Sequence, residues 1–151
     1  MKSLRTIAYL CYGLVGLLGF VFAYIYLIRP EFMPYHADAV GASWNEIDAG
    51  IKVLIIALMR VSGGGWMATS VSITLLLVAR IKFQKIYFGF ALVLVGLGGL
   101  IPTLYATLYV RTNSPAVPPW IAAAAGGISL LIIALVLDFL SYARLKNRNA
   151  D

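Results

Sequence analysis

The chain has 151 residues, of which 62% are hydrophobic and 12% charged, and its formal net charge is +6. An ordinary soluble domain is about 45–50% apolar and about 25% charged, and one of this length buries only about 70% of its unfolded surface. The composition therefore excludes a water-soluble globular protein, because too much apolar surface would stay in contact with water.

The first apolar stretch covers residues 6–28 and follows the basic residues Lys2 and Arg5. It is longer than the roughly 18 uncharged residues that indicate a transmembrane helix. No small-residue cleavage site precedes a hydrophilic region, so we predict an uncleaved helix and not a signal peptide. Cys11, the single cysteine, lies in this stretch and is predicted to be a small buried side chain.

The loop after this helix is the longest polar segment and carries Glu31, His36 and Asp38. His36 is the single histidine of the chain, so the sequence offers no Cys/His cluster for a metal or a haem, and we predict no cofactor. Farther along, Lys52 follows Asp48 by about one helical turn, a spacing that predicts a contact between their side chains.

The second apolar stretch, residues 51–79, is preceded by Ser43 and Glu46 in the spacing of a capping box. That spacing predicts that the second helix begins at about residue 44. A helix running unbroken from there to residue 79 would be about 54 Å long, against a hydrocarbon core of about 30 Å. We therefore expect it to tilt, to bend at residues 62–65, or to extend beyond the membrane.

Arg60 is the most informative residue of this helix, because a charged side chain within a membrane span usually marks a functional site with a partner. Counting back from the basic end of the helix places it at the outer boundary, near the loop. One hypothesis is an outer-face ligand-binding site formed by Arg60, His36, Glu31, Asp38 and Gly64. The alternative is that Arg60 forms a salt bridge with one loop carboxylate and so docks the loop on the bundle.

The third apolar stretch covers residues 86–110 and follows a short basic turn at residues 80–85, so the second and third helices should form an antiparallel hairpin. Pro102 lies inside the third stretch. A proline within a helix frees a carbonyl and kinks the helix, which is either structural or opens a small outer cavity.

The fourth apolar stretch covers residues 120–142 and follows a proline-rich connection at residues 113–119. Asp138 lies near its end. We expect its carboxylate to pair with Arg80, Lys82 or Arg144 on the cytoplasmic side, or to extend to the membrane interface. The alternative, a proton-relay carboxylate, lacks a second acid near that depth.

The basic residues predict the orientation of the four spans, because cytoplasmic loops are enriched in Lys and Arg. Eight of the twelve fall on one side. They are Lys2, Arg5, Arg80, Lys82, Lys85, Arg144, Lys146 and Arg148. This distribution predicts an all-α, antiparallel four-helix transmembrane bundle, one domain over residues 1–151, with both termini in the cytoplasm. It also explains the net charge through contact with anionic lipid headgroups, without nucleic-acid binding.

Three segments carry a resemblance to a known group of proteins. They are Arg-Pro-Glu-Phe-Met-Pro-Tyr-His at residues 29–36, Leu-Met-Arg at residues 58–60 and Gly-Gly-Gly-Trp at residues 63–66. With the four-span layout, they resemble a family of small, uncharacterised four-helix bacterial membrane proteins. The resemblance implies a multi-pass protein of the bacterial cytoplasmic (inner) membrane.

No catalytic motif is present, so we expect no catalytic residues and favour a non-enzymatic role. The predicted function is a small binding or accessory protein that holds a lipid-like molecule or a partner membrane protein at the outer polar site. The alternatives are a membrane-embedded enzyme with His36 and a carboxylate as acid and base, or a transporter subunit. Recurrent small residues on the helices predict close packing within the chain or a homo-oligomer.

Overall fold

The protein is described by a computed structural model over residues 2–148, and this part of the chain is entirely helical, with no strand. The predicted all-α fold is confirmed. The elements are α1 (Lys2–Ile28), α2 (Pro34–Val40), a short 3-10 helix η1 (Trp44–Glu46), α3 (Ala49–Phe83), α4 (Tyr87–Asn113) and α5 (Trp120–Arg148). The side chains of Lys2, Lys146 and Arg148 lie outside the described part.

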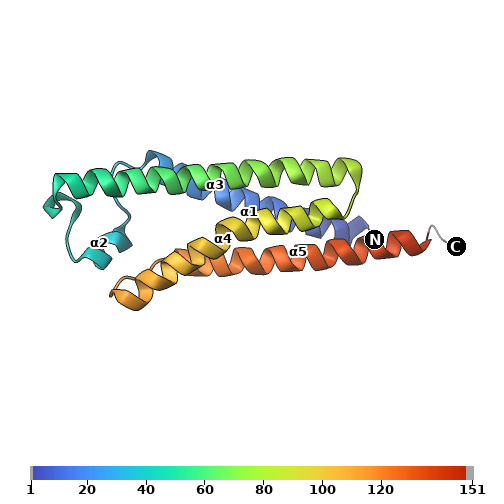
Figure 1. Cartoon of the computed structure of the whole chain (residues 1–151). Helices are drawn as coiled ribbons and strands as arrows, with labels where there is room; N and C mark the ends of the chain where they lie inside the picture. The colour runs from blue at the N-terminus through green and yellow to red at the C-terminus, as the bar shows by residue number, and fades with distance from the viewer. Residues whose placement is uncertain (1, 149–151) are drawn as a thin grey trace.

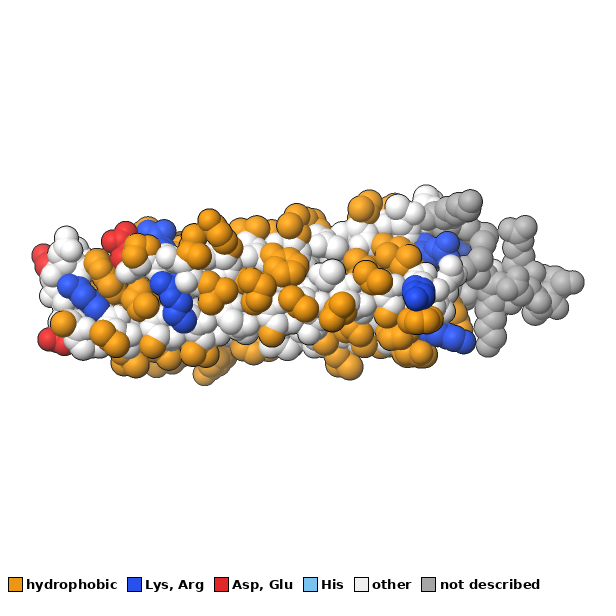
Figure 2. Space-filling model, turned by 90° about the horizontal axis from the view of Figure 1, so that it is seen from above, with side chains coloured by type: hydrophobic (Ala, Val, Ile, Leu, Met, Phe, Trp, Pro, Cys, Tyr) orange, Lys and Arg blue, Asp and Glu red, His pale blue; other side chains and the backbone are white. Residues whose placement is uncertain are grey.

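Four of these helices, α1, α3, α4 and α5, are long and apolar enough to cross a membrane. Each keeps large hydrophobic side chains on its exposed face, among them Leu10, Val53, Leu94 and Ile132. Figure 2 shows such side chains along the length of the molecule, between charged groups at its two ends. This is the surface expected of a multi-pass membrane protein, in which lipid and not water surrounds the middle of the bundle.

The four long helices pack in the cyclic order α1, α3, α4, α5, because each contacts the next and α5 also contacts α1. Both chain ends and the α3–α4 turn lie at one end of the bundle, which we call the terminal end (Figure 1). α2 and the α4–α5 connection lie at the opposite end, which we call the α2 end (Figure 1).

Close helix contacts are made where glycine faces a neighbouring helix. A Cβ atom on Gly63 of α3 would lie 2.8 Å from Leu27 Cγ and 3.0 Å from Leu27 N on α1. A Cβ atom on Gly96 of α4 would lie 2.5 Å from the Leu131 side chain on α5. These glycines therefore serve packing within the chain, as one of the two sequence interpretations expected.

The predicted start of the second helix is wrong. Ser43 and Glu46 do form the capping interaction, with the Ser43 amide donating to Glu46 Oε2 at 2.7 Å, but it closes only the single turn of η1. The backbone then becomes extended at Ile47, and α3 begins at Ala49. A capping box stabilises a first turn only, so it does not determine whether the helix continues.

Asp48 caps α3 in place of Ser43, because its Oδ1 accepts a hydrogen bond of 2.7 Å from the Gly50 amide. The predicted contact between the Asp48 and Lys52 side chains is therefore not made. The Lys52 ammonium lies 5.7 Å from the centre of the Trp44 ring instead. The lysine cation therefore interacts with the face of an aromatic ring and not with the carboxylate one turn before it.

α3 is an unbroken helix of 35 residues, and the glycine triplet at residues 63–65 does not interrupt it. At 1.5 Å per residue it is about 52 Å long, well beyond a hydrocarbon core of about 30 Å. Of the three glycines, Gly63 is buried against α1, whereas Gly64 and Gly65 are exposed. α4 in contrast changes direction near its middle, where Pro102 lies (Figure 1).

A buried ion pair joins α3 to α5 near the terminal end. Arg80 Nε and Nη2 donate to the two carboxylate oxygens of Asp138, at 2.9 Å and 2.7 Å. Arg80 is 2% exposed and Asp138 0% exposed. The expectation that Asp138 pairs with a basic residue is confirmed, and Arg80 is the partner among the three candidates.

Candidate binding site

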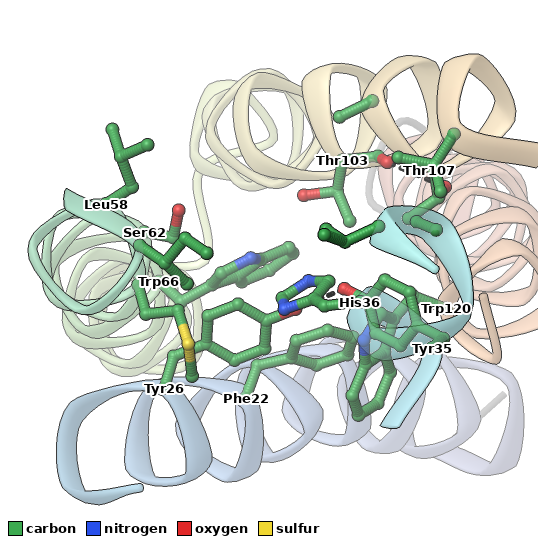
Figure 3. Close-up of a pocket in the computed structure, with 16 residues that line it drawn as sticks. Phe22, Tyr26, Tyr35, His36, Leu58, Ser62, Trp66, Thr103, Thr107 and Trp120 are labelled. Atoms are coloured by element: carbon green, nitrogen blue, oxygen red, sulfur yellow. Dashed lines mark hydrogen bonds between the residues drawn. The ribbon is translucent and has the colours of Figure 1, made fainter. Parts of the chain in front are cut away.

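The α2 end contains a cavity of about 390 Å³. All five helices contribute to its wall, and most of the lining side chains are aliphatic or aromatic. Figure 3 shows α1 below the cavity, α3 to its left, α4 above and α2 to its right. The groups in the wall that can form hydrogen bonds belong to Tyr26, Tyr35, His36, Ser62, Trp66, Thr103, Thr107 and Trp120.

The local sequence determines where the short helix α2 begins and ends. Pro34 occupies its first turn, where the missing N–H costs nothing. The ring nitrogen Nδ1 of His36 accepts the Met33 amide at 3.3 Å and so satisfies a backbone donor at the helix start. Gly41 ends the helix with φ of 72°, and its amide donates to the Ala37 carbonyl at 2.8 Å.

α2 is held against the bundle by apolar burial and one polar contact. Phe32, Met33 and Tyr35 are each at least nine-tenths buried, and Met33 and Tyr35 pack around the buried Ala116. Burying side chains of this size contributes about 1.5–3 kcal/mol each. The hydroxyl groups of Tyr35 and Tyr26 lie 2.8 Å apart and form a hydrogen bond between α2 and α1.

An aromatic cluster from three long helices forms one side of the cavity. The Phe22 ring lies with its centre 4.1 Å from that of Trp120 and 5.2 Å from that of Trp66, the latter in a stacked arrangement. The Tyr26 ring centre lies 6.3 Å from those of Phe22 and Trp120. Stacked rings fix one another's orientation, so this side of the cavity is preformed.

A second hollow of about 340 Å³ lies between α3 and α4, and we call it the lateral groove. It shares four residues with the cavity: Ser62, Trp66, Thr103 and Ala106. The rest of its lining includes Gly65, Gly98, Gly99 and Pro102. The sequence left open whether Pro102 is structural or opens a small outer cavity, and the structure places it in the lining of this groove. The glycines beside it have no side chains to fill the space.

The cavity wall carries no formal charge, since none of its lining residues is Asp, Glu, Lys or Arg. Burial, and secondarily the charge of Arg29, lowers the pKa of His36, so its imidazole is neutral at pH 7. Burial likewise raises the pKa of Tyr35, which keeps the phenol protonated. The site therefore offers neutral polar groups in an apolar surround.

Arg60 contacts the end of α1 and does not line the cavity. Its Nη1 donates to the Tyr26 carbonyl at 2.7 Å and its Nη2 to the Arg29 carbonyl at 2.9 Å. In the described part of the chain no carboxylate lies within ion-pair distance of Arg60, so the predicted salt bridge is wrong. The last carbonyl groups of a helix have no hydrogen-bond donor within the helix. The Arg60 guanidinium donates to two such carbonyl groups at the end of α1.

The other predicted site residues are dispersed. Glu31 is exposed and lies 3.6 Å from Arg29, Asp38 is exposed on α2, and Gly64 is exposed on α3. Of the five residues predicted for the outer site, His36 alone lines the cavity. The residues that the sequence analysis missed are Tyr26, Tyr35, Thr107 and Trp120. The available signal was the enrichment of Tyr and Trp near one predicted membrane boundary.

Among the described residues, no group of three His, Cys, Asp or Glu side chains could hold a metal ion. Comparison of the chain with protein-family models, with curated proteins and with solved structures finds no match. Function therefore has to be inferred from the geometry of the cavity and of the groove beside it.

Proposed function

We propose that this chain is a membrane-embedded binding protein that holds one lipid-like molecule in the cavity beneath α2. The observation that carries the proposal is the cavity itself, together with the four lining residues that it shares with the lateral groove. Sites for small molecules are concave, a few hundred Å³ in volume and mostly apolar, with a few polar groups that fix orientation. The cavity under α2 has each of these properties.

The lateral groove supports a ligand with an apolar tail. It is lined by residues of α3 and α4, and both helices also expose large apolar side chains, among them Val61 and Ile101. In a membrane those surfaces contact lipid chains, so a molecule dissolved in the bilayer reaches the cavity without passing through water. The polar part would lie under α2 and the tail in the groove.

The membrane setting forms part of the proposal. The described basic side chains Arg80, Lys82, Lys85 and Arg144 belong to the terminal end, so the positive-inside tendency places both termini in the cytoplasm, with α2 on the outer side of an antiparallel bundle. The resemblance to bacterial four-helix proteins points to the bacterial cytoplasmic membrane. The binding site would then lie in the outer leaflet.

The alternative of a membrane enzyme would need His36 and a carboxylate acting on one substrate. Glu31 and Asp38 are exposed and neither lines the cavity, so the geometry favours binding over acid–base catalysis. We therefore keep a binding or accessory role as the proposed function.

Native mass spectrometry of protein released from mild detergent tests the proposal. Ala106 lines both hollows, so Ala106→Phe fills part of the space on either side of it, whereas Ala68→Phe adds the same side chain at an exposed position of α3 outside both. We expect a discrete retained mass on the wild type and on Ala68→Phe, and its loss from Ala106→Phe at equal folded yield by circular dichroism.

Two results would contradict the proposal. One is a mass retained equally by Ala106→Phe, which would place the molecule outside the cavity. The other is the absence of any retained small molecule from all three proteins, with a second copy or another polypeptide bound instead. That result would favour a homo-oligomer or a partner membrane protein.

A further inference from the structure

The hydrogen-bonding groups of the cavity define the polar part of the ligand more closely, if the proposed function holds. We propose that the ligand is an uncharged lipid with a carbonyl oxygen at its polar end, and that the His36 ring and the Tyr26–Tyr35 hydroxyl pair donate hydrogen bonds to that oxygen. These residues line the cavity, and the ring and the hydroxyl pair each keep one donor that the fold leaves free.

The free donor of His36 follows from its contact with the backbone. Nδ1 accepts the Met33 amide, so it carries no proton, and in a neutral imidazole the proton must then be on Nε2. Within the described part of the chain Nε2 has no hydrogen-bond partner. The ring therefore presents an N–H donor while its other nitrogen holds the start of α2.

A second donor comes from a pair of hydroxyl groups. Tyr26 and Tyr35 share a single hydrogen bond between their hydroxyls, so one of the two hydroxyl protons remains free to donate. The Trp120 indole Nε1 is near the same hydroxyls, but it is fully buried by the protein and therefore offers no donor to the cavity.

The opposite wall of the cavity offers no free donor from its threonines. The Thr103 hydroxyl donates to the Gly99 carbonyl at 2.9 Å, and the Thr107 hydroxyl donates to the Thr103 carbonyl at 2.8 Å. Figure 3 shows both on α4, across the cavity from Tyr26 and Phe22. The threonines of α4 therefore add no free donor, whereas α2 and α1 carry the His36 ring and the hydroxyl pair, and α3 carries the Ser62 hydroxyl and the Trp66 indole N–H. The polar end of the ligand would lie under α2.

The absence of charge in the wall decides against an ionised ligand. A phosphate or carboxylate here would be buried without a cation, because the Arg60 guanidinium is already bonded to the Tyr26 and Arg29 carbonyls. An ammonium group would find no carboxylate in the wall. Burying an unpaired charge is far more costly than burying a neutral carbonyl that accepts hydrogen bonds. Two kinds of membrane lipid supply such an oxygen: an isoprenoid quinone and a diacylglycerol.

Titrations followed by native mass spectrometry test this inference on delipidated wild-type protein. The probes are a short-chain isoprenoid quinone, a short-chain diacylglycerol, the phosphatidic acid with the same acyl chains, and a carbonyl-free alkylbenzene with a tail matching the quinone. We expect at least one carbonyl probe to bind about tenfold or more tightly than its matched control, the size expected from one or two hydrogen bonds. The alkylbenzene controls for the quinone and the phosphatidic acid for the diacylglycerol, so the two sources are told apart.

Protein variants provide a second measurement. Tyr35→Phe removes one hydroxyl, and Tyr105→Phe is the matched control because Tyr105 is exposed and lies outside both hollows. We expect Tyr35→Phe to weaken binding of the carbonyl probe about tenfold and to leave alkylbenzene binding unchanged. The control should change neither.

Two outcomes would overturn the inference. In the first outcome, phosphatidic acid binds as tightly as diacylglycerol and the alkylbenzene binds as tightly as the quinone. This would show that the protein does not recognise a neutral carbonyl at the polar end of the ligand. The proposed lipid-binding function would survive that result. Failure of all four probes would overturn the inference too, and if Ala106→Phe also removed no retained mass, the proposed function would fail with it.

Discussion

Removing either partner of the Arg80–Asp138 pair should destabilise the bundle strongly. The pair is almost completely buried, and two charge-assisted hydrogen bonds of 2.9 Å and 2.7 Å join the partners. Asp138→Leu leaves a buried guanidinium without a counter-charge, and such a loss costs about 3–5 kcal/mol. Arg80→Met leaves the carboxylate unpaired at a similar cost. The double variant leaves no buried charge, so we expect it to lie within about 1 kcal/mol of the wild type or to exceed it in stability.

The free energy of unfolding can be measured by titrating the detergent-solubilised protein with dodecyl sulfate and following helix content by circular dichroism. Arg5→Met serves as the control, because the Arg5 side chain makes an exposed hydrogen bond to Gln84, and we expect its loss to cost less than about 1 kcal/mol. The reasoning would be refuted if Asp138→Leu cost no more than Arg5→Met. It would equally be refuted if the losses of the two single variants simply added in the double variant.

Three further predictions concern the α2 end. Arg60→Gln should lower the free energy of unfolding by about 2 kcal/mol in the same titration, because charge-assisted bonds to two carbonyls are lost; an unchanged value would contradict the capping role. Gly63→Ala should cost about 1–3 kcal/mol through overlap with α1, whereas Gly64→Ala, which meets no atom within 4 Å, should be neutral or slightly stabilising. Because the folded state lowers the pKa of His36 below its ordinary 6.5, it resists protonation, so docking of α2 should be complete at neutral pH and weaken as the pH falls. Tryptophan emission recorded from about pH 7.5 to about pH 5 should report this change, and His36→Gln should abolish it; a change on raising the pH would have the wrong sign.

The four spans could be predicted because each is a long, continuous run of apolar residues in the sequence. The predicted stretch at residues 120–142 lies inside α5, and the one at residues 86–110 matches α4 to within a few residues. A run of more than 18 apolar residues has few alternatives to a transmembrane helix. The start of α3 was missed because a capping box says nothing of the residues beyond its single turn.

The binding site was harder to predict because it depends on contacts between residues far apart in the sequence. Arg60 carries a charge and was expected to find an opposite one, but the carbonyls at the end of α1 are closer in the folded chain. Tyr35 was not singled out because it lies in a loop-like segment, and only the burial of α2 places its hydroxyl beside that of Tyr26. His36 was identified by residue type, and the local fold of the loop determines that its ring accepts the Met33 amide at the start of α2.

The Arg80–Asp138 pair also orders the biogenesis of the bundle. Arg80 precedes Asp138 by 58 residues, so α3 and α4 are synthesised before the counter-charge exists. Until α5 joins, the arginine must keep its guanidinium in the headgroup layer, as long basic side chains near helix ends do. When α5 inserts, the Asp138 carboxylate neutralises the Arg80 guanidinium, which then becomes buried in the bundle. The last helix therefore completes the bundle, because in a nascent chain without α5 the Arg80 guanidinium has no buried counter-charge.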